Sequence, residues 1–492
     1  MTRLRLGALG CLFFVLTGCA TSTLGVRYPN AGATDAEISR DLERLPQDLM
    51  AFVQEKQEGL SPQGVAENAK ATLLPPHTQQ ELATQYKESF YGPWKRKKSL
   101  FSANEVFYFP RSHPQGRLGY AENLRPVTPK AWRVLLANAN KEAFPSRDQH
   151  GITVVNTALR ALPTHKPFFK SPEIAGEGYP FDYFSHSALW IGSPVYISHA
   201  SADGLWLFVE TQRVSGWVPA RDVALVNDAF KSRWQSMPLG AVMQDGVVLS
   251  HVTSSGVSLP TALAHVGTLL PLENGAVFYP TRNTDGQAQV TKSPLANLRL
   301  SAELAGTGLR TGQGAGNRTE IGKNSSLMCT FPQPLTAEAL ARVGNVMMGQ
   351  PYGWGGYLEN RDCSALMLDI FTPFGVWLPR NSAQQGKAGR VVSLQNMSAS
   401  QKSELIRQQA KPFTTLIWLP GHIVLYVGEY EGIPSIYHDI WGVSIQDETG
   451  ARSRAVIGKV AVTSLSPGRE LKLVSSPSGI LDRMGSMVFL GE

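Results

Sequence analysis

The sequence predicts an α+β chain of several domains: an N-terminal helical segment, two small strand-rich units, and a C-terminal domain in which helices precede a sheet. Three observations predict this order. Apolar residues recur at helical spacing before residue 100, and short strands broken by Gly, Pro and Asp follow from about residue 146 to 300. After residue 334 a helical pattern gives way to β-rich runs. At 492 residues, the chain is too long for one hydrophobic core and fits three or four domains.

The first residues have the pattern of an export signal. Arg3 and Arg5 precede an apolar run, residues 6–16, that is too short to span a membrane as a helix. The run ends in Leu-Thr-Gly-Cys at residues 16–19, which resembles the lipobox of bacterial lipoproteins; a plain secretory signal is the alternative. The resemblance implies cleavage after residue 18 and acylation of Cys19. The chain would then be anchored in the cell envelope, in a membrane that faces the periplasm (the outer membrane) or at the cell surface if the cell is not Gram-negative.

The remaining boundaries follow changes in pattern along the chain. The helical pattern is clearest around Leu42 to Phe52 and from residue 79 to 91, and six glycines with no apolar period fill residues 305–323. The predicted parts are a signal peptide at 1–18, a tether and helical segment at 19–145, a first strand-rich unit at 146–228, a second at 239–300, a Gly-rich linker at 301–333 and the C-terminal domain at 334–492.

Composition narrows the function classes. The formal net charge is +7, a mild excess that suits an anionic wall or membrane surface. No nucleic-acid-binding motif accompanies it, so no nucleic-acid partner is expected. The sequence has no Walker motif and no His-Glu-x-x-His helix, and the Gly-x-Gly-x-Gly at residues 312–316 lacks the strand and helix of a dinucleotide site. We therefore expect no metal and no cofactor.

A nucleophile is predicted at Cys363. A Gly-rich turn at residues 353–356 leads into Asp362, a good N-cap, and the apolar spacing after it predicts a helix. Cys363 would then lie in the first helical turn, where free amides and the helix dipole favour a thiolate. A small buried cysteine is the plainer alternative. Of the four cysteines, only Cys329 and Cys363 remain after Cys11 and Cys19 are set aside, so no disulfide framework is expected, and Cys329 is predicted to be a bystander.

The base is predicted among two histidines that follow the cysteine. His422 and His438 lie in β-rich runs on either side of a loop at residues 428–432. A hairpin centred on Tyr430 would place the two imidazoles opposite each other on one face of the sheet, with Cβ atoms roughly 5 Å apart. One histidine could then act as base while the other orients it.

Taken together, these motifs resemble the NlpC family of cell-wall cysteine peptidases. The resemblance rests on Tyr-Gly-Trp-Gly-Gly at 352–356, Asp-Cys-Ser at 362–364, Pro-Arg-Asn-Ser at 379–382 and the β-rich run that opens with His422. One departure is Ala365, where the family commonly has Gly. The resemblance implies an α+β multidomain fold: a papain-like catalytic domain preceded by two small SH3-like β-barrels and an N-terminal clip-like helical segment.

The family resemblance also implies an activity and roles for individual residues. The activity is hydrolysis of the γ-D-glutamyl–diamino acid bond in peptidoglycan stem peptides. Cys363 would be the nucleophile, His422 its base and His438 the orienting residue. The implied substrate-binding residues are Tyr352, Asp362, Ser364 and Ser382. Simple capping is the alternative for Asp362, a helix N-cap the alternative for Ser382, and packing the expected role of Trp354.

The resemblance also implies that the first SH3-like domain narrows the substrate groove, so that only a stem peptide with a free L-Ala amine enters. Asp182, Tyr183 and Glu210 are the candidate partners of that ammonium, with ordinary surface roles as the alternative. Three other functions stay open: a catalytically silent wall-binding lipoprotein, a papain-like acyltransferase or lipid hydrolase, and a metal hydrolase that uses the two histidines.

Overall fold

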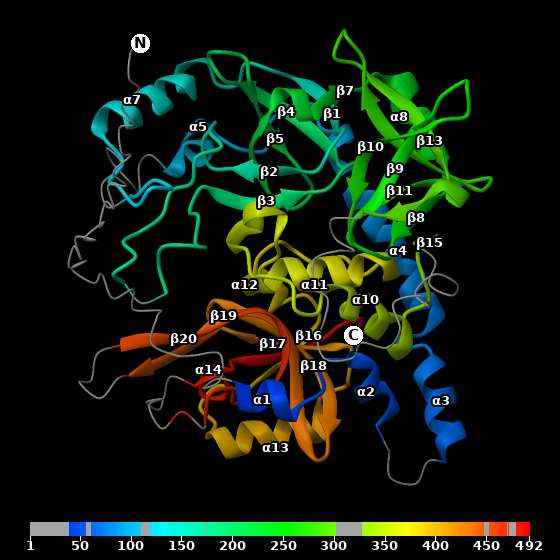
Figure 1. Cartoon of the computed structure of the whole chain (residues 1–492), viewed down its shortest axis with the longest axis vertical. Coiled ribbons are helices and arrows are strands. Elements are labelled where there is room, and N and C mark those ends of the chain that lie inside the picture. Colours follow the sequence, from blue (N-terminus) through cyan, green and yellow to red (C-terminus); the bar gives the residue numbers. More distant parts are fainter. Residues whose placement is uncertain are drawn as a thin grey trace, which may run out of the picture.

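The computed structural model describes residues 39–55, 61–109, 119–174, 176–301, 327–446, 452–469, 471 and 479–492. The predicted signal, Cys19, the tether and most of the predicted Gly-rich linker lie outside these residues. Figure 1 shows the two β units at one end of the molecule, the orange and red sheet of the C-terminal domain at the other, and helices between them. Among the described helices, none is both long and apolar enough to cross a membrane.

The N-terminal segment is a series of short helices, several of which lie against the C-terminal domain. The predicted first helix is interrupted at Pro46, after which Asp48 caps the next helix by accepting the Met50 N–H. Leu49 and Phe52 are buried in the core of the C-terminal domain. The helices are α1 (Ser39–Arg44), α2 (Leu49–Gln54), α3 (Pro62–Lys70), α4 (Pro76–Phe90), α5 (Ala103–Val106) and α7 (Pro129–Asn138).

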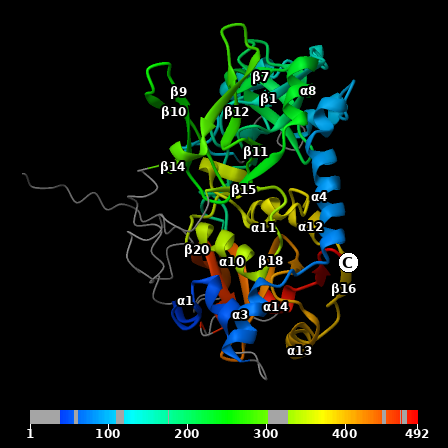
Figure 2. The same ribbon diagram turned by 90° about the vertical axis from the view of Figure 1, so that its right-hand side faces the viewer.

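Helix α4, predicted at residues 79–91, spans the distance between the domains, as Figure 2 shows. At its start, the Gln79 amide donates to the Phe374 carbonyl of the C-terminal domain at 2.9 Å. Just beyond its end, the Trp94 indole donates to the Gly151 carbonyl of the first β unit at 2.7 Å. The N-terminal segment therefore connects the two domains by buried hydrogen bonds at both ends of one helix.

The first β unit is one antiparallel sheet with the strand order β3-β2-β6-β5-β4-β1-β7. Its centre is apolar, with Val195, Val209 and Val218 fully buried. The strands are β1 (Gln149–Thr153), β2 (Thr157–Arg160), β3 (Ser185–Leu189), β4 (Pro194–Ala200), β5 (Trp206–Glu210), β6 (Ser215–Pro219) and β7 (Val223–Leu225).

The second β unit has two sheets, β10-β9-β14 and β13-β12-β11-β8-β15, and helix α8 (Asp228–Ser236) precedes it. Its last strand was not predicted: Met328–Thr330 pairs antiparallel with β8, although the sequence placed these residues in a linker. Its SH3-like character stays a prediction. The strands are β8 (Leu239–Val242), β9 (Val247–Val252), β10 (Ser258–Ala264), β11 (Leu269–Glu273), β12 (Ala276–Arg282), β13 (Ala288–Pro294), β14 (Arg299–Leu300) and β15 (Met328–Thr330).

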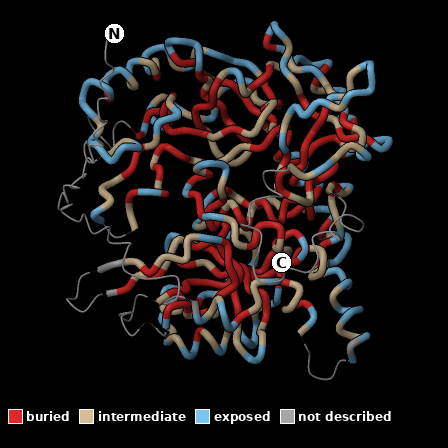
Figure 3. The backbone as a smooth tube through the Cα atoms, viewed as in Figure 1, coloured by how far each residue is buried: buried red, intermediate tan, exposed pale blue. Residues whose placement is uncertain are grey.

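The C-terminal domain has the predicted order, with helices first and then a six-stranded sheet, β16-β21-β17-β18-β19-β20. Helices α10 and α11 pack on one face of this sheet, and the other face has its own apolar core. Figure 3 shows buried residues concentrated in this sheet and in the middle of each β unit. The elements are α10 (Ala337–Met347), α11 (Cys363–Phe371), α12 (Ser382–Gln385), β16 (Arg390–Ser393), α13 (Ala399–Gln409), β17 (Thr415–Leu419), β18 (His422–Tyr430), β19 (Ile433–Gln446), β20 (Arg452–Ser464), α14 (Ile480–Arg483) and β21 (Ser486–Phe489).

The β18–β19 hairpin differs from the predicted register by an even number of residues. Its turn is only Glu431-Gly432, both with positive φ, which moves the pairing three positions beyond a hairpin centred on Tyr430. A bulge at Val427 takes one position back, so Leu425 pairs with Tyr437 rather than with Ser435. Because the net shift is two, the predicted faces of the strands are retained.

The Gly-rich turn before α11 lies directly against the first β unit. A Cβ atom on Gly355 would lie 2.1 Å from the Ser185 carbonyl oxygen, and one on Gly356 would lie 2.0 Å from the Ala188 nitrogen. Both glycines also have positive φ. These residues are therefore needed where two backbones meet, in addition to making the turn that was predicted.

A buried ionic cluster holds three parts of the chain together. The Arg361 guanidinium pairs with Asp369 of α11 at 2.7 Å and with Asp245 of the second β unit at 2.8 Å. Trp190 of the first β unit donates from its indole to Asp369 and lies under the guanidinium, 5.5 Å from ring centroid to Cζ. Because all four side chains are buried, the cluster lies at a junction of the C-terminal domain with both β units.

Candidate active site

Cys363 is the first residue of α11, and Asp362 is the N-cap of that helix, as predicted. The Asp362 carboxylate accepts the Ala365 N–H at 2.9 Å. The Cys363 side chain is 7% exposed and belongs to the core between the helices and the sheet. The predicted helix therefore places the thiol at its N-terminus, facing the sheet.

The two predicted histidines are in direct contact on the sheet. His422 Nε2 and His438 Nδ1 are 3.0 Å apart, and the ring centroids are 5.2 Å apart. Val424 and Ile436, which share their faces by strand alternation, lie together in the core on that side of the sheet. The juxtaposition predicted from the faces of the two strands is thus present, although the register is different.

The thiol lies against the strand backbone at the start of β18, next to His422 in the sequence. The backbone N–H of Ile423, the residue after His422, donates to the Cys363 sulfur. Helix α11 therefore brings its first residue to the strand end that carries the proposed base.

The electrostatics do not favour the predicted thiolate. Burial and the nearby Asp362 carboxylate raise the pKa of the Cys363 thiol, although the Ile423 amide opposes this. Burial, aided by the charge of Arg483, lowers the pKa of His422 to about 4. The free site therefore holds a neutral thiol beside a neutral imidazole, and the helix dipole is outweighed. A base has to take the proton as the sulfur attacks.

Tyr352 lies beside the cysteine. It is buried, and burial together with the charge of Asp362 holds the pKa of its phenol well above the usual range. Its ring packs against Phe181 from the first β unit and against Trp441 of β19, with centroids 5.9 and 6.2 Å apart. The first β unit therefore contributes an aromatic side chain, Phe181, to the surroundings of the tyrosine that lies beside the nucleophile.

The sequence of this region matches a known family. Residues 349–456 match the NlpC/P60 family. The C-terminal domain belongs to the NlpC/P60 peptidase family. Residues 8–144 match the N-terminal NLPC_P60 stabilising domain, and residues 167–219 match an SH3 domain of the SH3b1 type. NlpC/P60 peptidases are cysteine peptidases, so the chain combines such a peptidase domain with an SH3b domain and a stabilising segment.

Two known proteins are similar to the chain over different extents. The γ-D-glutamyl-L-lysine dipeptidyl-peptidase of Bacillus subtilis (strain 168) is 35% identical over 107 residues, which are 22% of this chain and 34% of that protein. The match thus spans about a third of the relative. An NlpC/P60 endopeptidase from Photobacterium damselae subsp. piscicida superposes with a TM-score of 0.76 over 91% of this chain and 97% of that one, at 24% identity. The second comparison shows that the multidomain fold is shared.

Asp362 and Ser364 in the NlpC/P60 domain are already hydrogen bonded inside the protein. Arg380 pairs with both Asp362 oxygens at 2.8 and 3.0 Å and donates to the Ser364 hydroxyl at 2.9 Å. A fourth hydrogen bond, from Arg380 to Ser187, joins this group to the SH3b domain at 2.8 Å. Direct substrate binding by Asp362 and Ser364 stays a prediction, and the capping role of Asp362 is present in any case.

Ser382 begins helix α12 but does not cap it. Asn381 is the N-cap and accepts the Gln384 N–H at 2.9 Å, so the alternative of a Ser382 cap was wrong. Ser382 is half-buried, and its substrate-binding role stays a prediction. Trp354, expected to be packing, is 37% exposed and lies 5.5 Å from Phe181 between ring centroids.

Two of the three predicted partners for a substrate ammonium already form buried ion pairs with arginines of the protein. Asp182 is fully buried in a 2.6 Å ion pair with Arg160. Glu210 is fully buried and pairs with Arg96 at 3.2 Å, on the N-terminal segment. Neither carboxylate is free for a substrate.

Tyr183, the third candidate, faces the Gly-rich turn. Its ring lies 6.1 Å from that of Trp354 between centroids, and its hydroxyl donates to Glu177 at 2.7 Å. The Lys170 ammonium lies 2.7 Å from the same hydroxyl and 3.1 Å from Glu177. An ammonium group is therefore already held by a tyrosine and a carboxylate on the site-facing side of the SH3b domain.

Sequence analysis missed several residues that shape the site. Arg380 belongs to the Pro-Arg-Asn-Ser motif, but the sequence predicted no role for it. Its contacts with Asp362, Ser364 and the SH3b domain depend on the folded structure. Glu177 was not considered, because nothing local distinguishes it from other surface acids. Among the described residues, no group of three or more His, Cys, Asp or Glu side chains is arranged to hold a metal ion.

Asp439 is a further residue that was missed. It follows His438 on β19, is 0% exposed, and neither carboxyl oxygen has a hydrogen-bond partner in the described structure. Burial and the charge of Asp362 hold the pKa of its carboxyl well above the usual range, with Arg361 opposing. It interacts electrostatically with Cys363, where a negative charge would further disfavour the thiolate. The neutral acid is thus the form that this site accommodates.

Replacing Asp439 by Asn should stabilise the protein in a pH-dependent way. The carboxyl ionises near pH 4 in the unfolded chain but only at higher pH in the folded one, so the wild-type free energy of unfolding falls as pH rises between the two pKa values. The slope is about 1.4 kcal/mol per pH unit. The gain from Asp439→Asn should be small at pH 3 and grow toward neutral pH in urea titrations. The exposed Asp285→Asn variant is the control, and a gain that does not depend on pH would contradict the expectation.

Proposed function

We propose that the protein is a cell-wall cysteine endopeptidase that hydrolyses the γ-D-glutamyl–diamino acid bond of peptidoglycan stem peptides and prefers a free N-terminal L-Ala. The observation that carries the proposal is Cys363 at the N-terminus of α11, whose sulfur accepts the N–H of Ile423, the residue after His422 of the His422–His438 pair. The NlpC/P60 match over residues 349–456 and the similarity to a γ-D-glutamyl-L-lysine dipeptidyl-peptidase support the substrate class.

The chemistry follows from the neutral free site. Cys363 Sγ attacks the γ-carbonyl carbon of D-glutamate while its proton passes to His422. The C–N bond then breaks, and His422 returns the proton to the leaving amine, which leaves a thioester on the cysteine. Water, deprotonated by His422, hydrolyses the thioester and regenerates the thiol. The N-terminus of α11 favours the negative charge that develops on the carbonyl oxygen.

The proposed preference for a free amine rests on the SH3b residues that contact the Gly-rich turn before the nucleophile. Phe181 and Tyr183 face Tyr352 and Trp354, and Glu177 accepts the Tyr183 hydroxyl. A substrate ammonium could take the place of the Lys170 ammonium at this carboxylate. An acylated nitrogen lacks the charge and adds bulk, so a stem peptide that is still attached to the glycan would bind poorly.

The test uses three substrates with the purified protein. L-Ala-γ-D-Glu-diamino acid should be cut faster than its N-acetyl form and than the same stem on muramic acid, because a hydrogen bond to a charged group contributes about 1.5–3 kcal/mol, roughly ten- to hundredfold in kcat/KM. Panels with L-lysine and with meso-diaminopimelate identify the diamino acid. Glu177→Gln should reduce the preference, whereas Glu173→Gln, on the exposed part of the same loop, should not.

The outcomes separate the parts of the proposal. Equal rates on free and acylated stems would remove the amine preference and leave the peptidase. Binding to sacculi without hydrolysis of any substrate would favour a wall-binding protein, and release of fatty acid from lipid vesicles would favour the acyltransferase or lipid hydrolase class.

A further inference from the structure

The hydrogen bonds around His438 continue beyond the histidine pair to Thr463 on β20. His438 Nε2 lies 3.0 Å from Thr463 Oγ1, and the threonine hydroxyl donates to the Ser464 carbonyl at 2.9 Å. Thr463 and His438 are both fully buried. The threonine is thus a fourth polar residue in line with the site, and it lies on a strand that the predicted site did not include.

The donor inventory fixes the direction of each bond. A hydroxyl has one proton, and a carbonyl oxygen can only accept, so Thr463 gives its proton to Ser464 and must accept one from His438 Nε2. Burial, together with the neighbouring His422, keeps the pKa of His438 well below its usual range, so this ring is neutral and has only that proton. His438 Nδ1 is therefore an acceptor, and the proton in the 3.0 Å bond belongs to His422 Nε2.

The same count of donors and acceptors then gives the tautomer of His422. A neutral His422 with its proton on Nε2 has its lone pair on Nδ1. That nitrogen is the one left to accept a proton from Cys363. If His438 had the opposite tautomer, His422 Nε2 would have to be an acceptor, its proton would sit on Nδ1, and the base would be lost.

We propose that Thr463 is a positioning residue that sets the tautomers of both histidines and so makes His422 Nδ1 the base. The inference rests on the proposed peptidase function for its catalytic consequence, although the tautomers themselves can be observed without turnover. Thr463 acts through His438 and does not touch the substrate.

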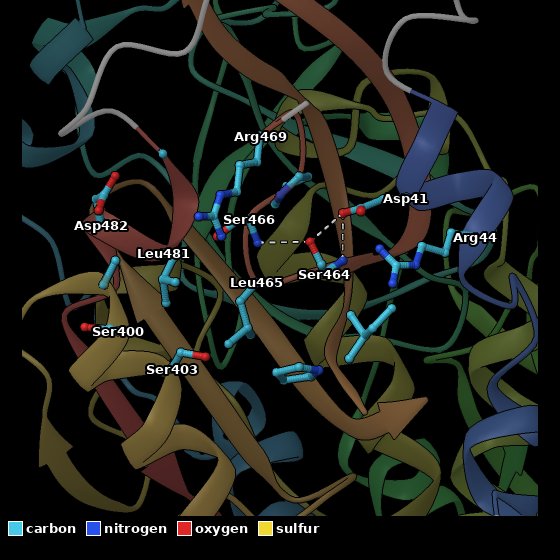
Figure 4. Close-up of a pocket in the computed structure, with 15 residues that line it drawn as sticks. Asp41, Arg44, Ser400, Ser403, Ser464, Leu465, Ser466, Arg469, Leu481 and Asp482 are labelled. Atoms are coloured by element: carbon cyan, nitrogen blue, oxygen red, sulfur yellow. Dashed lines mark hydrogen bonds between the residues drawn. The ribbon is translucent and has the colours of Figure 1, made fainter. Parts of the chain in front are cut away.

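The strand end that holds Thr463 is itself fixed by the N-terminal segment. Asp41 of α1 accepts the Ser464 N–H at 2.9 Å and its hydroxyl at 2.6 Å, and Figure 4 shows the carboxylate turned toward this serine at the rim of a pocket. Asp41 therefore orients the residue whose carbonyl receives the Thr463 proton. A chain of hydrogen bonds runs from α1 through β20 and β19 to the base.

The experiment compares Thr463→Val with Thr463→Ser. Valine keeps the shape of threonine but cannot accept from His438 Nε2, whereas serine keeps the hydroxyl. A wrong tautomer at the orienting position of a catalytic triad costs up to about 10⁴-fold in kcat, and Thr463 is one residue further away. We expect Thr463→Val to lower kcat by roughly tenfold to a hundredfold with KM nearly unchanged, and Thr463→Ser to restore most of it.

A spectroscopic readout separates positioning from a merely structural role. ¹⁵N-histidine NMR of the full chain, assigned with single His→Gln variants, should show His438 protonated on Nε2 and His422 on Nε2 in the wild type. In Thr463→Val, part of the His438 population should move its proton to Nδ1. The control is Thr415→Val, which removes a buried hydroxyl of the same sheet that accepts from Lys411 at 2.8 Å, away from the histidines; it should change neither tautomer nor kcat.

The results distinguish this inference from the proposed function. Unchanged tautomers in Thr463→Val would overturn the inference, whether or not kcat falls. A tautomer shift in a protein whose wild type hydrolyses no stem peptide would uphold the positioning role and reject the peptidase. A tautomer shift with undiminished kcat would overturn the claim that His422 Nδ1 is the base.

Discussion

Replacing Cys363 by Ala should abolish hydrolysis of the γ-D-glutamyl bond, with a fall in kcat of about 10⁴-fold or more, because the attacking atom is removed and no other group replaces it. The variant should fold, since the side chain is small and its main polar contact is a single amide from Ile423. Release of the diamino acid product, followed by mass spectrometry, measures the rate, and circular dichroism measures the fold.

Cys329→Ala is the matched control for that loss. Cys329 lies on β15, half-buried, 3.3 Å from the Met243 sulfur, and burial raises the pKa of its thiol to about 11. Both cysteines are free, so the variant breaks no disulfide. It should retain full activity, as expected of a bystander. Activity that survives Cys363→Ala, or disappears with Cys329→Ala, would place the nucleophile elsewhere.

Replacing Arg361 by Met should lower the free energy of unfolding by about 3–5 kcal/mol, because removing one partner of a buried ion pair leaves an uncompensated charge. Here two carboxylates, Asp245 and Asp369, would be left in the junction, together with the Val266 carbonyl that now accepts from the same guanidinium at 3.0 Å. Urea unfolding followed by tryptophan fluorescence measures the change, and Trp190 reports on the junction.

Arg342→Met serves as the surface comparison. Arg342 forms an ion pair of similar length, 2.7 Å, with Glu338 four residues earlier, but its side chain is 60% exposed. An exposed pair of this kind contributes about 0.3–0.5 kcal/mol. If the two variants lost similar stability, the junction cluster would have no special role in holding the domains together.

The sequence predicted best what depends on near neighbours along the chain. The Asp362 cap, the helix that starts at Cys363 and the faces of the two histidine strands follow from local spacing and side-chain chemistry. The predicted register was wrong, but the predicted contact of the two histidines was still correct. The turn at Glu431-Gly432 and the bulge at Val427 together shift the register by an even number of residues. Either change alone would have put the imidazoles on opposite faces.

What could not be predicted depends on contacts between distant parts of the chain. Strand β15 forms because Met328–Thr330 pairs with the edge of β8. Cys329 of this strand also contacts Met243, which is 86 residues earlier in the sequence. The thiolate was predicted from the helix terminus alone, while the burial and the Asp362 charge that oppose it depend on packing. Arg380 and Glu177 acquire their importance only where the SH3b domain meets the peptidase domain.

The contact of Gly355 and Gly356 with β3 has a consequence for exchanging modules between proteins of this architecture. The loop that leads to the nucleophile has no side chains where it meets the backbone of Ser185 and Ala188. The main chains of the loop and of β3 are in direct contact, and there is no room for a side chain between them. A transplanted SH3b domain would have to reproduce that backbone path, and not merely a compatible set of side chains. The peptidase domain and its neighbour are therefore interchangeable only as a pair.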